Sequence, residues 1–101
     1  MKLFIRDEVV EDVEGIKRHI AADNVEAANR FGPVVLAASD VLLAFPYIGR
    51  PRTFNLVAGV RSWGVPGFRN YLIFYRVKSD AVDVLAVLEG HRDTAAILRK
   101  R

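Results

Sequence analysis

The stretch VDVLAVLEG, at residues 82–90, would place apolar side chains on both faces of an extended chain. A strand that is apolar on both faces is buried on both sides, which predicts a central position in a sheet. The stretch NYLIFYRV, at residues 70–77, is rich in aromatic and β-branched residues and indicates a second strand. LVAGVRSWGV, at residues 56–65, indicates a third, with Pro66-Gly67 and KSDA as the turns between them. Three adjacent strands with short turns predict an antiparallel meander.

The first 45 residues have a helical periodicity instead, which begins after a short candidate strand, KLFI, at residues 2–5. Acidic residues crowd the start of the first expected helix and basic residues lie near its end, as the helix dipole favours. Its apolar positions are Val9, Val13, Ile16 and Ile20. Asp23 or Asn24 can cap a second helix, which Gly32-Pro33 is expected to kink or delay. Its apolar positions are Ala27, Phe31, Val34 or Val35, Ala38, Leu42 and Phe45.

These elements follow one another in the order β-αα-βββ-α, with a short basic helix expected at residues 93–101. Two antiparallel helices, each with one apolar stripe, need a second layer to cover them. The sequence therefore predicts a single α+β domain over residues 1–101. In it, a helical hairpin packs on one face of a small antiparallel sheet.

The composition excludes several kinds of site. The chain has no cysteine and two histidines, so we expect no disulfide, no metal and no cofactor. The stretch with fewest charges, residues 31–49, carries Asp40 near its centre and is expected to be a buried helix, not a membrane span. No secretory signal is visible at the start, and we expect a cytoplasmic location.

Charge is distributed unevenly along the chain. Residues 1–45 hold five Lys/Arg against eight Asp/Glu, and residues 46–101 hold ten against four. Arginine side chains bind phosphates and carboxylates in pairs of hydrogen bonds, so a polyanion and an acidic protein are both plausible partners. The candidate target- or phosphate-binding residues are Arg50, Arg52, Arg61, Arg69 and Arg92.

The stretch VLEGHRD, at residues 87–93, combines a histidine, an arginine and two carboxylates. An RNase without a metal needs a base, an acid and cations, so His91, Arg92, Arg61 and Arg76 are the candidate catalytic residues. The alternative is structural: a buried strand ends here, and Asp93 caps the last helix. We expect a protein that is not an enzyme, or else a metal-independent endoribonuclease.

A resemblance to a known family covers nearly the whole chain. The ordered segments DVEGIKRHIAADNVEAANRF, LLAFPYIGRPR, GVRSW, NYLIFYRV and VLEGHRD resemble the RelE/ParE superfamily of type II toxin–antitoxin toxins. AADNVEAA, FPYIGRPR and YLIFYRV are similar to ParE in particular. By position, the following residues match the ParE-like pattern: Arg50, Arg61, Tyr71, Tyr75, Arg92 and Asp93.

The resemblance implies a bacterial toxin that binds and poisons DNA gyrase, with plasmid stabilisation and growth inhibition as its expected roles. It also implies a hetero-oligomer in which a cognate antitoxin holds the toxin inactive. Apolar side chains off the main helical stripes and the two strand tyrosines are the expected antitoxin contacts: Val10, Val41, Leu43, Tyr71 and Tyr75. Tyrosines on one face of a strand are more often half-buried core residues, and this is the alternative role for Tyr71 and Tyr75.

The sequence departs from the ParE-like pattern at one motif. ParE-like toxins tend to have a histidine before the glycine, where this chain has Glu89. Gly90-His91-Arg92 is instead similar to RelE-like toxins, which cleave mRNA on the ribosome, although the tyrosine that often follows in them is missing. The alternative function is therefore a RelE-like endoribonuclease that uses His91 and arginines. A third hypothesis is an attenuated module that binds its antitoxin without being toxic.

Overall fold

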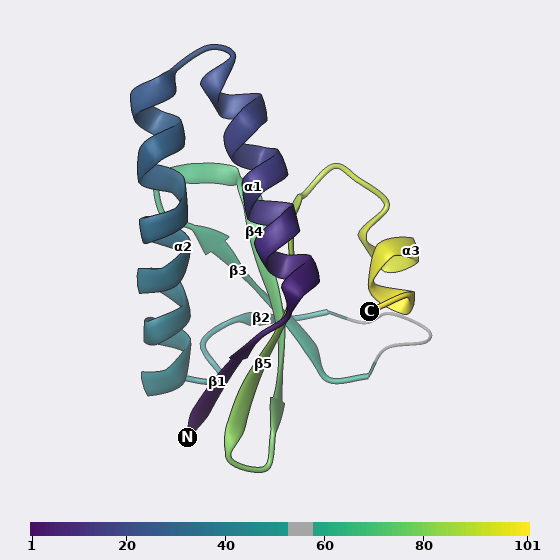
Figure 1. Ribbon diagram of the computed structural model, residues 1–101. Coiled ribbons are helices and arrows are strands. Elements are labelled where there is room, and N and C mark those ends of the chain that lie inside the picture. The colour runs from purple at the N-terminus through teal and green to yellow at the C-terminus, as the bar shows by residue number, and fades with distance from the viewer. Residues whose placement is uncertain (53–57) are drawn as a thin grey trace.

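The computed structural model describes residues 1–52 and 58–101, which form a five-stranded sheet and three helices (Figure 1). The order along the chain confirms the predicted α+β class, with the helical hairpin between the first strand and the others. The elements are β1 (Lys2–Ile5), α1 (Asp7–Ala21), α2 (Val25–Ala44), β2 (Arg50–Pro51), β3 (Val60–Val65), β4 (Phe68–Lys78), β5 (Ala81–Glu89) and α3 (Thr94–Arg99). Residues 56 and 57 of the third predicted strand lie outside the described residues.

The sheet is mixed, with the strand order β1-β5-β4-β3-β2. β3, β4 and β5 form the predicted antiparallel meander, and β5 lies inside the sheet. The expectation of a wholly antiparallel sheet was wrong at one edge, where β1 pairs with β5 in parallel. Parallel neighbours cannot be joined by a tight turn, and all the elements from α1 to β4 lie between β1 and β5 in the chain. The two-residue strand β2, which pairs with β3, was not predicted.

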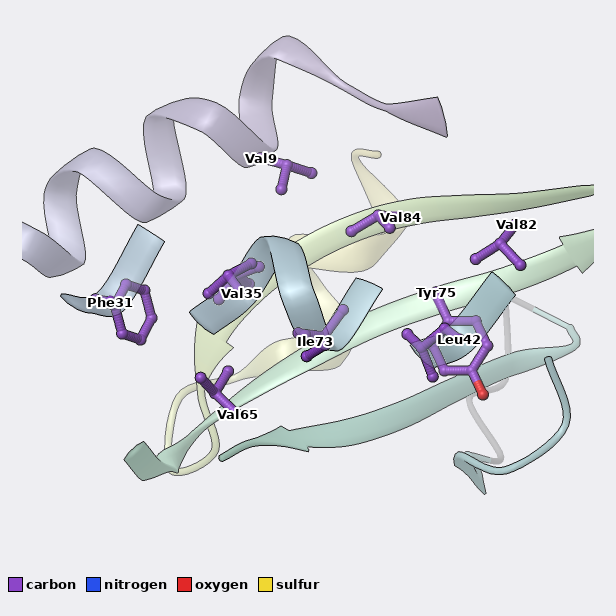
Figure 2. Packing of buried hydrophobic residues seen from close by; sticks show 11 residues of the cluster. Val9, Phe31, Val35, Leu42, Val65, Ile73, Tyr75, Val82 and Val84 are labelled. Atoms are coloured by element: carbon purple, nitrogen blue, oxygen red, sulfur yellow. The ribbon is translucent and has the colours of Figure 1, made fainter. Parts of the chain in front are cut away.

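The hairpin α1–α2 covers one face of the sheet, and the main hydrophobic core lies between them (Figures 1 and 2). Figure 2 shows Val35 and Leu42 of α2 beside Ile73 and Tyr75 of β4, with Phe31 farther along the helix in the same core. A smaller cluster lies on the opposite face, where α3 packs through a buried leucine. Its buried members are Val60, Phe74, Leu85, Ala86, Leu88 and Leu98.

The helices begin and end for local reasons. Asn24, not Asp23, is the cap of α2: its side-chain oxygen accepts the N–H of Ala27 at 3.0 Å. α2 runs unbroken through Gly32-Pro33, because glycine before proline has no Cβ to clash with the proline ring. The prediction that Phe45 joins the buried stripe was wrong, since α2 ends at Ala44 and Phe45 is 63% exposed.

One β-bulge interrupts the pairing of β4 with β5. Phe74 pairs with Ala86 and Tyr75 with Val84, so Leu85 is the extra residue. β1 no longer covers the other edge of β5 at this point, because its pairing ends at Val84. Two side chains bond to the exposed backbone instead: Asp12 Oδ2 accepts the N–H of Val87 at 3.1 Å, and Arg101 Nη1 donates to the carbonyl of Leu85 at 3.1 Å.

Asp12 and Arg101 also form a two-pronged ion pair, with both N–O distances at 2.9 Å. Their side chains are only 12% and 14% exposed. This pair, defined here as the Asp12–Arg101 clamp, ties α1 and the segment after α3 to the irregular part of β5. Arg6 extends it by donating to the main-chain oxygen of Arg101.

A second charged cluster surrounds Asp83 of β5, which lies on the sheet face opposite the hairpin. Arg6 binds both carboxylate oxygens, at 2.9 and 3.3 Å. Burial is the largest single influence and acts to raise the pKa of Asp83, but the hydrogen bonds and charge of Arg6, with the charges of Lys78 and Arg76, outweigh it and lower that pKa.

Asp83 is therefore expected to make the fold sensitive to acid. Its pKa is lower in the folded than in the unfolded chain, so its contribution is complete above the unfolded pKa of about 3.9 and is lost as pH falls through the lower, folded pKa. Urea unfolding below about pH 4 should show a loss of stability in the wild type that Asp83→Asn does not share. Parallel pH profiles of the two proteins would contradict this assignment.

Candidate functional site

The stretch VLEGHRD does not form a catalytic cluster. Val87 and Leu88 are buried in β5, and Gly90 donates its N–H to the carbonyl of Asn70 at 2.8 Å. Asp93 caps α3 as predicted, because its side chain accepts the N–H of Ala96 at 3.1 Å. His91 is exposed in the turn between β5 and α3. Within the described residues, its ring makes no hydrogen bond or ion pair.

The candidate catalytic arginines are held apart by the sheet. Arg61 pairs in register with Tyr75, whose side chain faces the helical hairpin, whereas Arg76 lies on the opposite face beside Asp83. Arg92 lies beyond the end of β5, and its side chain is exposed. Because these groups lie on two faces and at one end of the sheet, their placement does not favour the nuclease hypothesis.

The remaining candidate arginines serve different local roles. Arg50 and Arg69 are exposed, while Arg52 donates from Nε to the hydroxyl of Ser62 at 2.7 Å. Arg61 binds the loop after α2, donating to the carbonyls of Tyr47 and Gly49 at 3.1 and 2.8 Å.

That loop, residues 45–49, is held by hydrogen bonds to its backbone and yet exposes large apolar side chains. The guanidinium of Arg61 lies over the Tyr47 ring, 5.1 Å from its centroid, in a cation–π contact. Phe45, Tyr47 and Ile48 are 63%, 66% and 43% exposed. We call residues 45–49 the anchored loop. Prolines and a glycine such as those in FPYIGRPR are typical of a turn, but they do not indicate that its apolar side chains face solvent.

Tyr75 is the second anchor of this loop. Its phenol accepts the N–H of Gly49 at 2.9 Å and donates to the carbonyl of Pro46 at 2.8 Å. A Cβ on Gly49 would lie 2.3 Å from the phenol oxygen, so only glycine fits there. Burial raises the pKa of Tyr75, against the opposing influences of the Gly49 N–H and the charge of Arg61. Tyr75 was named as an expected antitoxin contact, but its side chain is fully buried, so it is a core residue that presents no surface to a partner.

Replacing Tyr75 by phenylalanine is expected to lower the free energy of unfolding by about 1–3 kcal/mol. The change removes two hydrogen bonds and leaves the buried N–H of Gly49 without an acceptor. Urea unfolding measures the loss, and amide exchange at Gly49 should become faster. Tyr71→Phe is the matched control, because the Tyr71 hydroxyl makes no hydrogen bond within the described residues. Equal losses in the two variants would rule out the anchoring role.

An apolar groove of about 150 Å³ runs between the two helices of the hairpin, beside β1. Val10 and Leu36 flank it and are 52% and 54% exposed. Apart from Gly32 and Ser39, its lining is aliphatic, and the Ser39 hydroxyl already donates to the carbonyl of Val35. The full lining is Ile5, Val9, Val10, Val13, Gly32, Val35, Leu36, Ser39 and Val84.

Of the other expected antitoxin contacts, Val41 is 41% exposed, whereas Leu43 is partly buried against the core. Neither lines the apolar groove. Leu36, which does, was not singled out from the sequence, because an exposed leucine in a helix is ordinary until the groove beside it is known.

A polar groove of about 370 Å³ lies on the other side of α1, against the end of β5. Tyr71 forms part of its wall and packs edge-on against Phe31, with ring centroids 5.4 Å apart. Burial, and then the charge of Glu89, raise the pKa of Tyr71. His19, Glu89 and Arg92 also line this groove, which brings together residues from both ends of the sequence.

The sequence matches the family described as ParE toxin of type II toxin-antitoxin system, parDE, over residues 3–94. The chain belongs to the ParE toxin family. Because the match spans β1 to the start of α3, it includes both grooves and the anchored loop.

A solved structure described as the chromosomal ParDE TA system from P. aeruginosa has the same fold as this ParE-family chain. The two share 22% sequence identity with a TM-score of 0.73, and the match covers 88% of this chain and 95% of the other. Comparison with curated proteins found no match. Among the described residues, no helix is long and apolar enough to cross a membrane.

Proposed function

We propose that this protein is the toxin of a type II toxin–antitoxin pair and that its antitoxin occupies the apolar groove between α1 and α2. The observation that carries the proposal is the ParE family match, which spans every residue of that groove. Membership in the family supports an antitoxin as partner, and the groove provides a surface for one.

The shape and chemistry of the groove suit an amphipathic helix. Such a helix places apolar side chains at every third or fourth position into a groove lined by apolar residues. Val10 and Leu36 stand on opposite rims, one on each helix, and expose about half of their surface. Covering them removes apolar surface from water, which is the main driving force of protein association.

Replacing both Val10 and Leu36 by lysine is expected to weaken antitoxin binding by about a hundredfold, because two charged groups would have to be desolvated in an apolar contact. Both side chains are half exposed, so the fold should persist. Calorimetric titration with the antitoxin measures the effect. Val25→Lys, at a position on α2 that is 64% exposed and outside the groove, is the control. Equal affinity of the double variant and the control would exclude the groove as the site.

The cellular target we propose is DNA gyrase, bound through the anchored loop. The strongest contacts in protein interfaces are commonly aromatic or arginine side chains, and groups held rigid before binding lose less entropy. Phe45 and Tyr47 are exposed aromatic residues on a loop whose backbone is anchored by hydrogen bonds, Ile48 is exposed beside them, and exposed Arg50 lies directly after the loop. This surface is separate from the apolar groove, so the protein can be tested for two independent partners.

A supercoiling assay with purified gyrase tests the target. The wild-type protein should inhibit supercoiling, and Tyr47→Ala should raise the concentration needed by about tenfold or more. The same variant should bind the antitoxin as the wild type does, because Tyr47 lies outside the apolar groove. If excess wild-type protein leaves supercoiling unchanged, gyrase is not the target. If Tyr47→Ala inhibits fully, the loop is not the contact.

A further inference from the structure

The sheet face opposite the helical hairpin carries a basic surface at the end where β1 meets the β4–β5 hairpin (Figure 1). Leu3 packs into the core on the hairpin side, so alternation places Lys2 and Phe4 on the opposite face. Phe4 pairs in register with Asp83, and Asp83 pairs with Arg76 of β4. We call this surface the basic platform: Lys2, Phe4, Arg6, Arg76, Lys78 and Asp83.

The platform holds more positive charge than its own carboxylate neutralises. Arg6 alone satisfies Asp83, with bonds to both oxygens. Arg76 and Lys78 remain at 3.8 and 3.6 Å from that carboxylate, beyond good hydrogen-bond distance. The four cations and Asp83 sum to +3, and counting Asp80 of the adjacent turn leaves +2. Like charges held close together favour the binding of an anion.

Arg76 provides independent support for an anion-binding site on the platform. Its Nε is buried and has no hydrogen-bond partner within the described residues. A buried donor without a partner costs free energy, and it is commonly found where a ligand completes the bonding. The side chain of Arg76 is 30% exposed, so its guanidinium can donate to a further oxygen ligand beside the exposed ammonium of Lys78.

The exposed ring of Phe4 indicates which kind of anion the platform binds. Its ring is 54% exposed on the edge strand β1, in the same row of the sheet as Asp83 and Arg76. Neighbouring strands lie about 4.8 Å apart, so the backbone of Phe4 lies about 10 Å from that of Arg76. Proteins that bind single-stranded nucleic acid combine an exposed aromatic ring, on which a base stacks, with cations along the backbone.

We propose that the basic platform binds single-stranded nucleic acid, with a base stacked on Phe4 and phosphates held by Lys2, Arg76 and Lys78. This binding is additional to the proposed antitoxin and gyrase contacts, because no platform residue lies in the apolar groove or the anchored loop. Through the basic platform, the protein would contact a single strand of DNA or RNA without the help of another protein.

Fluorescence anisotropy with labelled oligothymidylate and oligouridylate tests the proposal and separates DNA from RNA as the natural strand. Phe4→Ala should weaken binding about tenfold with an unchanged salt dependence, because stacking involves no counterion. Lys2→Ala with Lys78→Ala should weaken binding and reduce the slope of log affinity against log salt by about 1.4, since each phosphate contact contributes about 0.7. Melting temperatures and antitoxin binding of all variants should match the wild type.

The charge-matched control is Lys17→Ala with Arg30→Ala, which removes two cations from the helical hairpin. Equal weakening by the control pair would mean that net charge alone binds the strand, and the platform would be excluded. Wild-type affinity of Phe4→Ala would exclude stacking and overturn the proposal. So would competition by a polyglutamate peptide as strong as that by the unlabelled oligonucleotide, because the site would then select acidic protein segments.

Discussion

Replacing Asp12 by alanine is expected to lower the free energy of unfolding by about 3–5 kcal/mol, because it leaves the largely buried Arg101 without its carboxylate. The change also removes the acceptor of the Val87 N–H at the bulge of β5. The loss should therefore exceed that of an ordinary ion pair at the surface, for which 0–1 kcal/mol is typical. Urea unfolding followed by circular dichroism measures it directly.

A double-mutant cycle separates the two roles of Asp12. Arg101→Ala removes the guanidinium and its bond to the Leu85 carbonyl but leaves the bond from the Val87 N–H intact. The double variant should be less destabilised than the sum of the two single variants, because neither partner is then left unpaired. Additive losses, or a loss below about 1 kcal/mol for Asp12→Ala, would contradict the proposed strength of the clamp.

Truncating Phe31 to alanine is expected to cost about 3–5 kcal/mol, since the side chain is fully buried and leaves a cavity between α2 and the sheet. Its ring also makes edge-on contacts with Phe68 and Tyr71, at centroid distances of 5.0 and 5.4 Å. Such pairs contribute about 0.5–1.5 kcal/mol beyond the area that they bury.

Phe45→Ala provides the matched control for that cavity. The same substitution, on a side chain that is 63% exposed just after the same helix, should change stability by less than about 0.5 kcal/mol. A thermal or urea denaturation series on the two variants compares them. Similar losses at the two positions would show that the core is not organised around Phe31.

Local patterns predicted most of the fold because they depend on neighbours in sequence. Simple alternation along an extended strand accounts for the two faces of β4: Ile73 and Tyr75 pack under the hairpin, while Phe74 lies in the opposite cluster. The apolar run of β5 indicated its interior position. The parallel direction of β1 was missed, because four residues carry no signal of the partner that they choose.

The contacts that shape the candidate surfaces depend on residues far apart in sequence, and no local pattern indicates them. Asp12 looked like one more acidic residue in the first turns of a helix, yet it bonds to Arg101. Arg61 was a candidate target- or phosphate-binding residue and Tyr75 a candidate antitoxin contact, yet both hold the anchored loop. A charged or aromatic side chain can be assigned to a binding surface only after its contacts within the fold are known.

The pairing of β1 with β5 has a consequence for how the chain acquires its structure. Lys2 pairs with Ala81, so this part of the sheet closes across nearly eighty residues, whereas the hairpin α1–α2 and the meander β3–β5 form from near neighbours. Contacts of long sequence separation are slow to form, because the chain must first lose the entropy of a large loop. During synthesis, β1 remains without its strand partner until β5 has left the ribosome. The basic platform, which needs both strands, therefore exists only in a nearly complete chain.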